Sequence, residues 1–581
     1  MNQVMEDGSK QLKRWIIPKR NQETERRIQE SLGISSLVAC SLVNRGIETP
    51  EDAETYLNPR LDQLHDPKLL PDYEPAVKTI LNARDQNQKI FIHGDYDVDG
   101  LSSTALLTRF LKSIGCDVLP HVPHRTREGY GIHLDAVLEA QNKRAHLFLT
   151  CDCGAKAHEQ ILAAKEAGMK VVVTDHHEIS ETLPEAEAIM NPHRKDSKYP
   201  FQYLSGAGVV FKLCEGLTEE LGIAKEKYYR AYLDLATLGT VADVVPLHGE
   251  NRLIVKHGLP LLKNSQKQGI QALLKVCSPE FSPIHELKAS HIGFRLGPRL
   301  NAVGRIDEAS LALDLLLSMD PNEARKLAEK LDEMNQQRRL EQQRCFEEAL
   351  EKIFKNNAHE KPVIVVSDPN WHPGIIGLIA SKLTDRFYKP SFVITADPAT
   401  GTGKGSARTI PGFHLAHALD QLENLLLSGG GHEMAAGFSL SLENIEPFEQ
   451  ALHSYAQNKL KPEDWIPSFQ VDAEVSMKET DFLATTELEA LEPFGEANHE
   501  PLFVCRNVIL LNIQHTRNPE HCRLTLQSHQ GEIRQAMAFG LGNQFSKKHV
   551  GHKIDVLFSS VIDTYNGSKQ LKWHIKDFFI R

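Results

Sequence analysis

The sequence predicts an α/β protein of two lobes that carries a small β-barrel at its C-terminal end. Short apolar runs alternate with stretches of helical spacing in residues 85–307, and the same pattern returns in residues 359–460. Such alternation is typical of parallel α/β sheets. After residue 468 the pattern changes to five or six short alternating runs within about 110 residues, which predicts a closed β structure.

Composition places the chain among ordinary globular proteins. Of its 581 residues, 41% are hydrophobic and 25% are charged, which excludes collagen, coiled-coil arrays and global disorder. The net charge of −11 means that nucleic acid could bind only in a local basic groove. Nine cysteines, an odd number, argue for a reducing compartment. A polar N-terminus without a signal-peptide pattern, and no apolar stretch of about 18 residues, lead us to expect a cytoplasmic protein.

The first lobe is predicted from its strand-like runs and the helical stretches between them. The strand-like runs lie at 89–93, 118–122, 147–150 and 171–174. The helical stretches lie at 101–111, 134–141 and 159–167. In a parallel sheet of this kind, functional groups gather just past the carboxyl ends of the strands.

The remaining segments are a connecting helix, a second lobe and the barrel. Residues 308–355 are charged, with Leu at helical spacing and no Pro after Pro321, which predicts a long solvated helix. The barrel strands are expected at 471–475, 502–513, 522–526, 533–539, 554–561 and 571–575, an arrangement like an OB-fold. We therefore divide the chain into an N-terminal helical region (1–84), a first lobe (85–307), a connecting helix (308–358), a second lobe (359–460) and an OB-like barrel (468–581).

Acidic and imidazole side chains follow the strand-like runs of the first lobe. They are His93, Asp95, Asp97, Asp99, Asp152, Asp175, His176 and His177, and Asp243 follows an apolar helical stretch. A single Asp at a strand end is more often a helix N-cap, and a His pair is usually structural. In an extended segment, however, alternation would place His93 and the next three carboxylates on one side, where only a cation could neutralise them.

The chemistry of these donors narrows the choice of cation. Carboxylates together with imidazoles suit Mn²⁺ or Mg²⁺ better than they suit a thiolate zinc site. Cys151 and Cys153 flank Asp152, but without a second Cys or His pair we expect them to be small buried side chains.

The combined motifs resemble the DHH phosphoesterase superfamily, which is named for the triplet at 175–177, and their order resembles that of the RecJ single-strand-specific exonucleases. The resemblance covers roughly residues 85–581. It extends to SGAGVVFK (205–212), GPRLNAVGR (297–305), HPGIIG (372–377) and GGGHEMAAG (429–437), the last being the signature of the DHHA1 domain. The EPFGEAN stretch (492–498) also looks like the family, and it departs from the family pattern at 497–499, in the linker into the barrel.

The resemblance implies a 5′→3′ exonuclease on single-stranded DNA that acts in recombination and repair and releases 5′-mononucleotides by two-metal hydrolysis. Asp97 would bind one Mn²⁺ or Mg²⁺ ion, with His93 as co-ligand. The second ion would be held by Asp99, His176 and Asp243, and Asp152 would bridge the two ions. Asp95 and Asp175 would orient these ligands, and His177 would face the scissile phosphate. The resemblance also implies single-strand-binding protein and a helicase as partners, and we expect a monomer with no membrane contact.

The resemblance further implies two groups of substrate-binding residues. Arg125 and Arg305, with Arg299 as a partner, would bind the 5′ phosphate, since the planar guanidinium binds phosphate oxygens in pairs. The alternative is that Arg299 and Arg305 form ion pairs with Asp307 or Glu308. In the second lobe, His372, Arg408 and His432 lie in or near glycine-rich segments that could approach phosphates, although a glycine-rich turn without this role is the alternative.

The barrel is the basic part of an acidic chain. Residues 501–581 contain 11 Lys or Arg against 5 Asp or Glu, with aromatic residues among them. Such a mixture suits single-strand binding by base stacking and phosphate attraction. We expect Phe503 and Phe539 in the barrel core, and Tyr565 and Trp573 at the surface.

Two other functions stay open at this point. The same chemistry could act on a smaller substrate, such as pyrophosphate, a cyclic dinucleotide or very short RNA, but the chain length and the basic C-terminal region count against this. The protein could also be a non-catalytic subunit of a replication complex, but every expected carboxylate is present.

Overall fold

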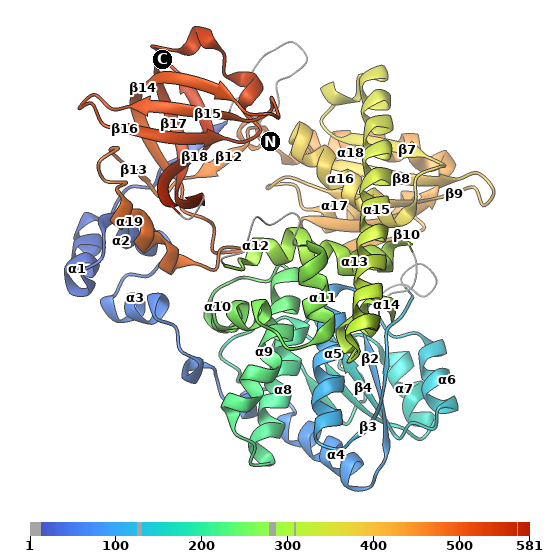
Figure 1. Cartoon of the computed structure of the whole chain (residues 1–581). Helices are drawn as coiled ribbons and strands as arrows, with labels where there is room; N and C mark the ends of the chain where they lie inside the picture. The colour runs from blue at the N-terminus through green and yellow to red at the C-terminus, as the bar shows by residue number, and fades with distance from the viewer. Residues whose placement is uncertain (1–12, 125–130, 278–285, 307–309, 566–567) are drawn as a thin grey trace. The chain divides into compact units, whose positions relative to one another are not determined.

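The computed structural model describes residues 13–124, 131–277, 286–306, 310–565 and 568–581. The chain divides into two compact units (Figure 1). Unit 1 contains the described residues of Met1–Leu57, Arg339–Leu491 and Glu500–Arg581, and unit 2 contains those of Asn58–Arg338 and Glu492–His499. Among the described helices, none combines the length and apolar composition that a membrane span requires.

Unit 2 is built on a five-stranded sheet in which every neighbouring pair is parallel, as the alternation of strands and helices predicts. The strand order is β3-β2-β4-β5-β6. The strands are β2 (Lys89–Gly94), β3 (Asp117–His121), β4 (Leu147–Cys151), β5 (Lys170–Thr174) and β6 (Ala188–Met190). The three central strands are mostly buried, because helices cover both faces of the sheet.

Alternate strand residues point into two separate hydrophobic cores. Ile90 and Ile92 belong to the larger core, with α5 (Val98–Ser113), α8 (Gly206–Glu220) and α9 (Lys225–Ala242). Phe91 and Phe148 belong to the smaller core, with α6 (Leu134–Asn142) and α7 (His158–Glu166). Figure 1 shows α6 and α7 beside the sheet on the side away from α8 and α9. The sheet edge that carries the acidic motifs is therefore held rigidly from both faces.

The other helices of unit 2 extend the larger core. They are α4 (Tyr73–Asp85), α10 (Gly249–Lys263), α11 (Gln268–Cys277), α12 (Ala289–His291), α13 (Gly297–Ile306) and α14 (Ser310–Leu317). Helix α4, which lies largely in the segment that the sequence analysis groups with the N-terminal region, packs against β6 and α8. Residues 58–84 are accordingly part of unit 2.

The predicted helix at 308–355 is two helices. The long helix α15 spans Pro321–Lys355, and α14 ends at Leu317. Proline has no N–H group and its ring crowds the preceding turn, so Pro321 is favoured at the start of α15 and disfavours a helix that runs on from α14. The Ser318 hydroxyl donates to Glu323 at 3.0 Å in the first turn of α15, which fixes the junction.

The second lobe, in unit 1, has a mixed sheet with the order β10-β11-β9-β8-β7. Its strands are β7 (Ile364–Asp368), β8 (Ser391–Asp397), β9 (Thr402–Arg408), β10 (Ser428–Gly431) and β11 (Ala435–Ser441), and its helices are α16 (Pro373–Phe387), α17 (Leu415–Gln421) and α18 (Ile445–Lys459). The pair β7–β8 is parallel, and the other three pairs are antiparallel. The connection from β8 to β9 is too short for the crossover that a parallel pair needs.

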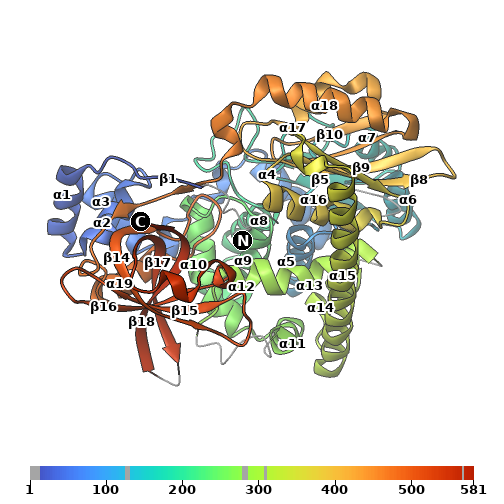
Figure 2. The ribbon, with the colours of Figure 1, turned by 90° about the horizontal axis from the view of Figure 1, so that it is seen from above.

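The C-terminal strands form the predicted closed barrel, because β14 pairs with both β15 and β17. The strands are β12 (Ser468–Gln470), β13 (Ala473–Glu474), β14 (Phe503–His515), β15 (Cys522–Gln527), β16 (Ile533–Ala538), β17 (Lys553–Tyr565) and β18 (Ser568–Ile580). Strand β1 (Arg14–Ile16) pairs with β12, and α19 (Phe482–Glu487) precedes the barrel. The N-terminal helices are α1 (Gln22–Leu32), α2 (Ser36–Val43) and α3 (Pro50–Leu57), and Figure 2 shows them beside the barrel.

The barrel interior corrects two expectations about aromatic residues. Phe503 is buried, as expected, but Trp573 is also fully buried and stacks on Phe558 with ring centroids 3.8 Å apart. Phe539, expected in the core, is 52% exposed. The reason is spatial: Trp573 lies opposite the small side chain of Ala536 on β16 and fills that volume. The side chain of Tyr565 lies outside the described residues.

The Trp573→Ala variant should lower the free energy of unfolding of the barrel by about 3–5 kcal/mol, because it removes a large buried ring and leaves a cavity. Hydrogen exchange of the β17 and β18 amides in the full chain measures this change. Phe539→Ala, at an exposed position, is the matched control and should cost less than about 1 kcal/mol. Equal effects of the two variants would contradict the assignment of Trp573 to the core.

Candidate functional site

The acidic motifs of unit 2 converge at one edge of its parallel sheet. Asp95 and Asp97 follow β2, Asp152 follows β4, and the triplet 175–177 follows β5. Asp243 joins them from the C-terminus of α9. The topology produces this convergence, because parallel neighbouring strands bring their carboxyl ends to the same edge of the sheet.

His176 lies at the centre of the cluster. Its Nε2 atom is 3.0 Å from Asp152 Oδ1, 3.5 Å from Asp243 Oδ2 and 3.8 Å from Asp99 Oδ2. Asp99 and Asp152 are buried. One imidazole nitrogen therefore faces three carboxylates, two of which have little access to water.

The donor atoms fall into three overlapping groups, each with its atoms within 4.8 Å of one another. The groups are Asp95, Asp97 and Asp152; Asp99, His176 and Asp243; and Asp152, His176 and His177. Asp152 belongs to two of them and His176 to two. This arrangement suits two neighbouring cations with a shared carboxylate better than it suits one cation.

The state of the central atoms also fits a bound cation. Asp152 Oδ1 and His176 Nε2 are buried and, within the part of the chain that the structure describes, neither makes a hydrogen bond. Buried polar atoms in proteins are nearly always satisfied, so such a pair needs an explanation. Carboxylate oxygens and an imidazole nitrogen are donors suited to Mn²⁺ and, through the carboxylates, to Mg²⁺. The residues present therefore fit the divalent ions that the sequence implies.

Backbone groups hold Asp99 in place. Asp99 accepts hydrogen bonds from the backbone N–H groups of Gly206 and Ala207, at 2.6 and 2.9 Å, at the N-terminus of α8. A Cβ atom on Gly206 would lie 2.5 Å from Asp152 Oδ1, so only glycine allows this close approach. The SGAG motif at 205–208 thus positions two carboxylates, a role that the sequence analysis did not assign to it.

Asp97 caps the helix that carries Asp99. It accepts hydrogen bonds from the backbone N–H groups of Asp99 and Gly100, at 2.9 and 3.0 Å, as the N-cap of α5. Asp97 is therefore a helix N-cap, as the alternative interpretation of the sequence held, and it also belongs to one of the donor groups.

Burial and mutual repulsion set the protonation of the cluster. Burial, together with the charge of Asp97, raises the pKa of Asp99 to about 7. Burial and neighbouring carboxylates also raise the pKa of Asp152 and of Asp243 well above the usual range. Burial lowers the pKa of His176 to about 3, so this imidazole is neutral and its nitrogen is available as a ligand.

His177 and Asp175 form a separate pair. The Nδ1 atom of His177 lies 2.8 Å from Asp175 Oδ1, and the second oxygen of Asp175 accepts from the backbone N–H of Ala155 at 2.8 Å. Burial alone would lower the pKa of His177 and raise that of Asp175. The hydrogen bond with Asp175 and its negative charge nevertheless raise the pKa of His177, and the hydrogen bond with His177 and its positive charge lower the pKa of Asp175. His177 is half-exposed, so it can both hold a proton and reach a bound phosphate.

His93 does not lie with the other candidate ligands. It is fully buried, with Nδ1 3.1 Å from His121 Nδ1 and Nε2 3.2 Å from the carbonyl oxygen of Gly131. None of the donor groups found in the described residues includes it. His93 and the three carboxylates after it do not alternate along one extended strand, because the strand ends at Gly94 and the chain then turns into α5, which starts at Val98.

Of the three arginines expected to bind the 5′ phosphate, the structure describes the side chain of one. Arg299 is buried and pairs with Asp332 on α15 at 2.7 Å, an ion pair that the sequence analysis assigned to other acids. Arg299 is thus held within the fold. Arg125 and the side chain of Arg305 lie outside the described residues.

The candidates of the second lobe lie at two ends of its sheet. Arg408 is paired with Ala435 across β9 and β11, and the backbone N–H of His432 donates to the Ala435 carbonyl oxygen at 2.8 Å. His372 follows β7 at the opposite end of the sheet, where its Nδ1 accepts from Gly374 at 3.0 Å as the N-cap of α16. His432 is exposed and Arg408 is half-buried.

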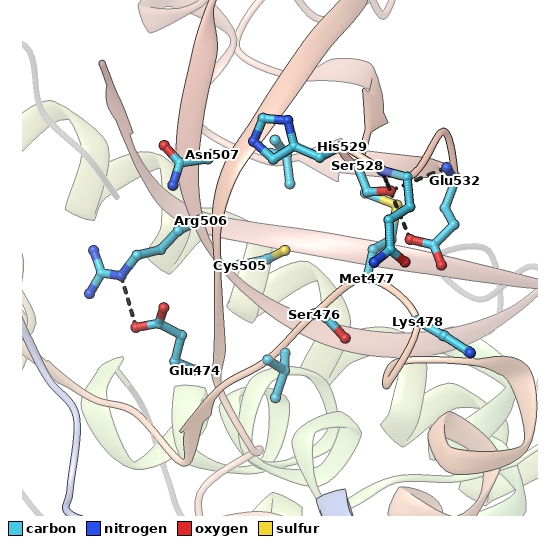
Figure 3. Close-up of a pocket in the computed structure, with 13 residues that line it drawn as sticks. Glu474, Ser476, Met477, Lys478, Cys505, Arg506, Asn507, Ser528, His529 and Glu532 are labelled. Carbon is cyan, nitrogen blue, oxygen red and sulfur yellow. Dashed lines mark hydrogen bonds and ion pairs between the residues drawn. The ribbon is translucent and has the colours of Figure 1, made fainter.

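The barrel contains a polar pocket of about 620 Å³ between β13, β14 and the β15–β16 hairpin (Figure 3). Arg506 lines it, but this guanidinium pairs with Glu474 at 2.8 Å and with Asp555 at 3.1 Å. Glu532 also lines the pocket, where it accepts from the Ser528 hydroxyl. The charged residues of the lining are Arg506 and Lys478 against Glu474 and Glu532, so the pocket offers a phosphate no net positive charge.

A second exposed surface of the barrel lies on the outer face of β14–β16. Arg523 on β15 is exposed, and the register places Gln514 and Met537 beside it. The exposed ring of Phe539 follows β16 and contacts the rings of His521 and His574 edge-on. The sequence signal for this surface was present, since buried Ala536 and Ala538 leave Phe539 on the outward side of an alternating strand.

Three segments of the chain match known protein families. Residues 89–240 match the family model for the DHH family, N-terminal domain; residues 360–458 match the DHHA1 domain; and residues 471–577 match the RecJ OB domain. The crystal structure of RecJ in complex with Mn²⁺ from Thermus thermophilus is similar, with a TM-score of 0.82 and 29% sequence identity. The similarity covers 97% of this chain and 79% of that chain.

Two curated relatives are similar over almost the whole chain. The single-stranded-DNA-specific exonuclease RecJ of Bacillus subtilis is 36% identical over 565 residues, which is 97% of this chain and 70% of the relative. The protein of the same name from Salmonella typhimurium is 33% identical over 580 residues, which is 96% of this chain and 98% of the relative. On this similarity and the shared order of domains, the chain belongs to the RecJ family of DHH phosphoesterases.

Proposed function

We propose that this protein is a metal-dependent exonuclease that degrades single-stranded DNA from the 5′ end, in recombination and repair. The observation that carries the proposal is the set of three overlapping donor groups at the edge of the sheet, in which Asp152 and His176 each belong to two groups. The activity named for the Bacillus and Salmonella relatives supports it. A single-strand-binding protein and a helicase as partners, a monomeric state and a cytoplasmic location belong to the same proposal and rest on the family resemblance.

The cluster would hold two Mn²⁺ or Mg²⁺ ions. RecJ structures from Thermus thermophilus contain Mn²⁺ or Mg²⁺, which supports this choice of metals. We assign Asp95, Asp97 and Asp152 to one ion, with Asp95 in the place proposed earlier for His93. We assign Asp99, His176 and Asp243 to the other ion, with Asp152 as the bridge. Bound there, the ions would supply the Lewis acidity that activates water and neutralises the charge of the transition state.

Side chains of the protein would hold and donate the proton that the leaving group needs. Asp175 accepts a hydrogen bond from His177 Nδ1–H, which fixes the imidazole and directs its Nε2 away from Asp175. Because its pKa is raised, His177 carries a proton that it can donate to the leaving oxygen of the cleaved phosphodiester. Before that transfer, the charge of Asp175 stabilises the imidazolium, which becomes a neutral imidazole when the proton leaves.

Strand binding and polarity form the next part of the proposal. Arg125 and Arg305 would bind the 5′ phosphate, while Arg299 would act through the fold by its pair with Asp332. In the second lobe, the exposed glycine strand β10 with His432 and Arg408 would contact the DNA backbone, and His372 would fix the start of α16. In the barrel, Arg523 and Phe539 would bind the strand by phosphate attraction and stacking.

Asp97→Ala and Asp152→Ala should each reduce hydrolysis by at least about a thousandfold, because each removes a ligand of the paired cations. Binding of single-stranded DNA should persist, because the proposed strand contacts lie elsewhere. Digestion of 5′- and 3′-labelled single and double strands, with Mn²⁺, Mg²⁺ or a chelator, measures activity, polarity and cofactor together. Asp117→Ala, at an exposed residue of β3, is the matched control. Full activity of either ligand variant would refute the assignment.

Asp152→Asn should raise the melting temperature of the metal-free protein by about 2–4 °C for each kcal/mol of repulsion that it relieves. The reason is that Asp152 is a buried carboxylate among other carboxylates, which raise its pKa. The same variant should lose most of the additional stabilisation that Mn²⁺ gives to the unmodified protein. Thermal unfolding with and without Mn²⁺ tests both, and Asp117→Asn should behave like the unmodified protein. A variant that Mn²⁺ still stabilises fully would show that Asp152 is not a ligand.

Binding of Mn²⁺ should strengthen as the pH rises from 6 to 7, by up to about tenfold for each proton that the ion displaces. The sign follows from Asp99, whose pKa of about 7 means that a proton competes with the ion below this pH. Titration calorimetry in buffers of different ionisation enthalpy counts the released protons. Asp99→Asn should bind the ion more weakly and flatten the slope, whereas an unchanged slope would assign the proton to another group.

A further inference from the structure

A second functional surface lies at the far end of α5 from the acidic cluster. Helix α5 begins beside Asp97 and ends at Ser113, and its 16 residues span roughly 24 Å at 1.5 Å per residue. Beside Ser113 is a hollow of about 1000 Å³, with walls from α5, α9, the α10–α11 connection and the end of α14. All of its walls belong to unit 2, and the proposed nuclease mechanism uses none of them.

Three cations stand at the rim of the hollow. Lys112, Lys227 and Arg230 line it and are exposed, and in the described structure they have neither an ion pair nor a side-chain hydrogen bond. Lys227 and Arg230 lie three residues apart on α9 and so share one face of that helix. Lys227 lies in the first turn of α9, where the helix dipole favours acidic residues, so helix stability does not explain this cation.

Apolar side chains also line the hollow. Leu261 and Leu317 are half-buried, and Met319 is 77% exposed. The half-buried ring of Tyr232 lines it too, with its hydroxyl 3.4 Å from the Ser113 hydroxyl oxygen. An exposed methionine at the edge of a concave apolar surface is typical of a site that adapts to a partner side chain.

The inner cations are already engaged by the protein. Arg109 donates to the carbonyl oxygen of Leu316 at 3.0 and 2.8 Å, at the C-terminus of α14. Lys267 donates to both oxygens of Asp234 at 2.8 Å, and burial lowers the pKa of this lysine. Only the rim cations are therefore available for a ligand.

The lining of the hollow favours some anions over others. Helices α5, α10 and α14 end at the hollow, whereas α11 begins there and Lys227 lies in the first turn of α9, so three of these five helix ends carry negative partial charge. A compact phosphate deep in the hollow would meet those three ends and the half-buried apolar side chains. A ligand with carboxylates at the exposed cations and an apolar side chain against the leucines matches both kinds of lining residue.

We propose that this hollow binds an acidic peptide segment of a partner protein, with its carboxylates at Lys112, Lys227 and Arg230 and an apolar side chain against Met319 and Leu261. The roughly 24 Å length of α5 separates this contact from the acidic cluster, so the partner can be bound while the metal centre stays accessible. Charge complementarity at the rim would also speed association with an acidic partner.

A fluorescein-labelled decapeptide of Asp, Glu, Phe and Leu serves as the probe, with fluorescence anisotropy of the full-length protein as the readout. Binding should weaken as NaCl is raised from about 50 mM to about 300 mM, because the rim charges are exposed. The double variant Lys227→Glu, Arg230→Glu should weaken binding by about tenfold or more. Met319→Ser should weaken it without changing its salt dependence.

Matched controls separate the site from general charge effects. The double variant Lys78→Glu, Lys195→Glu changes the net charge equally at two exposed positions of unit 2 outside the hollow, and should bind the probe like the unmodified protein. Probes with Asn and Gln for the acids, or with Ser for the apolar residues, should bind at least about tenfold more weakly. Thermal unfolding, and hydrolysis of labelled single-stranded DNA at an unchanged rate, confirm that the hollow variants are folded.

Three results would overturn the proposal. The first is no binding of the acidic probe beyond that of its uncharged counterpart. The second is equal binding by the Lys227→Glu, Arg230→Glu variant and the unmodified protein. The third is displacement of the probe by an unlabelled oligothymidylate that itself loses affinity in the same double variant, which would assign the hollow to nucleic acid. Loss of nuclease activity through the metal-ligand variants has no bearing on these outcomes.

Discussion

Carboxylates are crowded at one buried edge of the sheet in unit 2, and their mutual repulsion is the constraint that the rest of this unit has to accommodate. Three parallel strands deliver Asp95, Asp152 and Asp175 to this edge, and the helix ends add Asp97, Asp99 and Asp243. Burial, and after it the charge of the neighbouring carboxylates, raises the pKa values of Asp99, Asp152 and Asp243. A protein that keeps such an arrangement needs a positive charge to offset it, and divalent cations supply that charge most compactly.

Helix N-termini offset part of the repulsion between the carboxylates and hold two of these carboxylates in position. The first turn of α8 donates two backbone hydrogen bonds to Asp99, and the first turn of α5 donates two to Asp97. Each interaction of a charge with a helix end contributes about 0.3–1 kcal/mol, which is less than the cost of burying a carboxylate. The helices can therefore orient the acids without neutralising them, and the unsatisfied remainder makes the site selective for cations.

The sequence predicted four of the five strands in the first lobe, their parallel direction and the acids at their ends, because these follow from local apolar periodicity. It failed where the answer depends on a change of backbone direction or on a contact that is distant in sequence. His93 is separated from the cluster because the strand ends at Gly94. Arg299 finds its partner, Asp332, on another helix, which no local spacing reveals. Trp573 is buried because its neighbour on β16 is the small Ala536, a pairing set by barrel closure.

Helix α5 connects the two charged ends of unit 2. Its first turn carries Asp97 and Asp99, and Lys112 stands in its last turn, so the distribution of charge follows the helix dipole at both ends. The same 16 residues are packed in the larger core through most of their length, which prevents either end from moving without the other. In a chain with a net charge of −11, this leaves a basic rim at the opposite end of the helix from the acidic cluster. A cation-binding centre and an anion-binding surface on one protein can then act side by side, because a rigid helix keeps an acidic partner away from the metals that it would otherwise compete for.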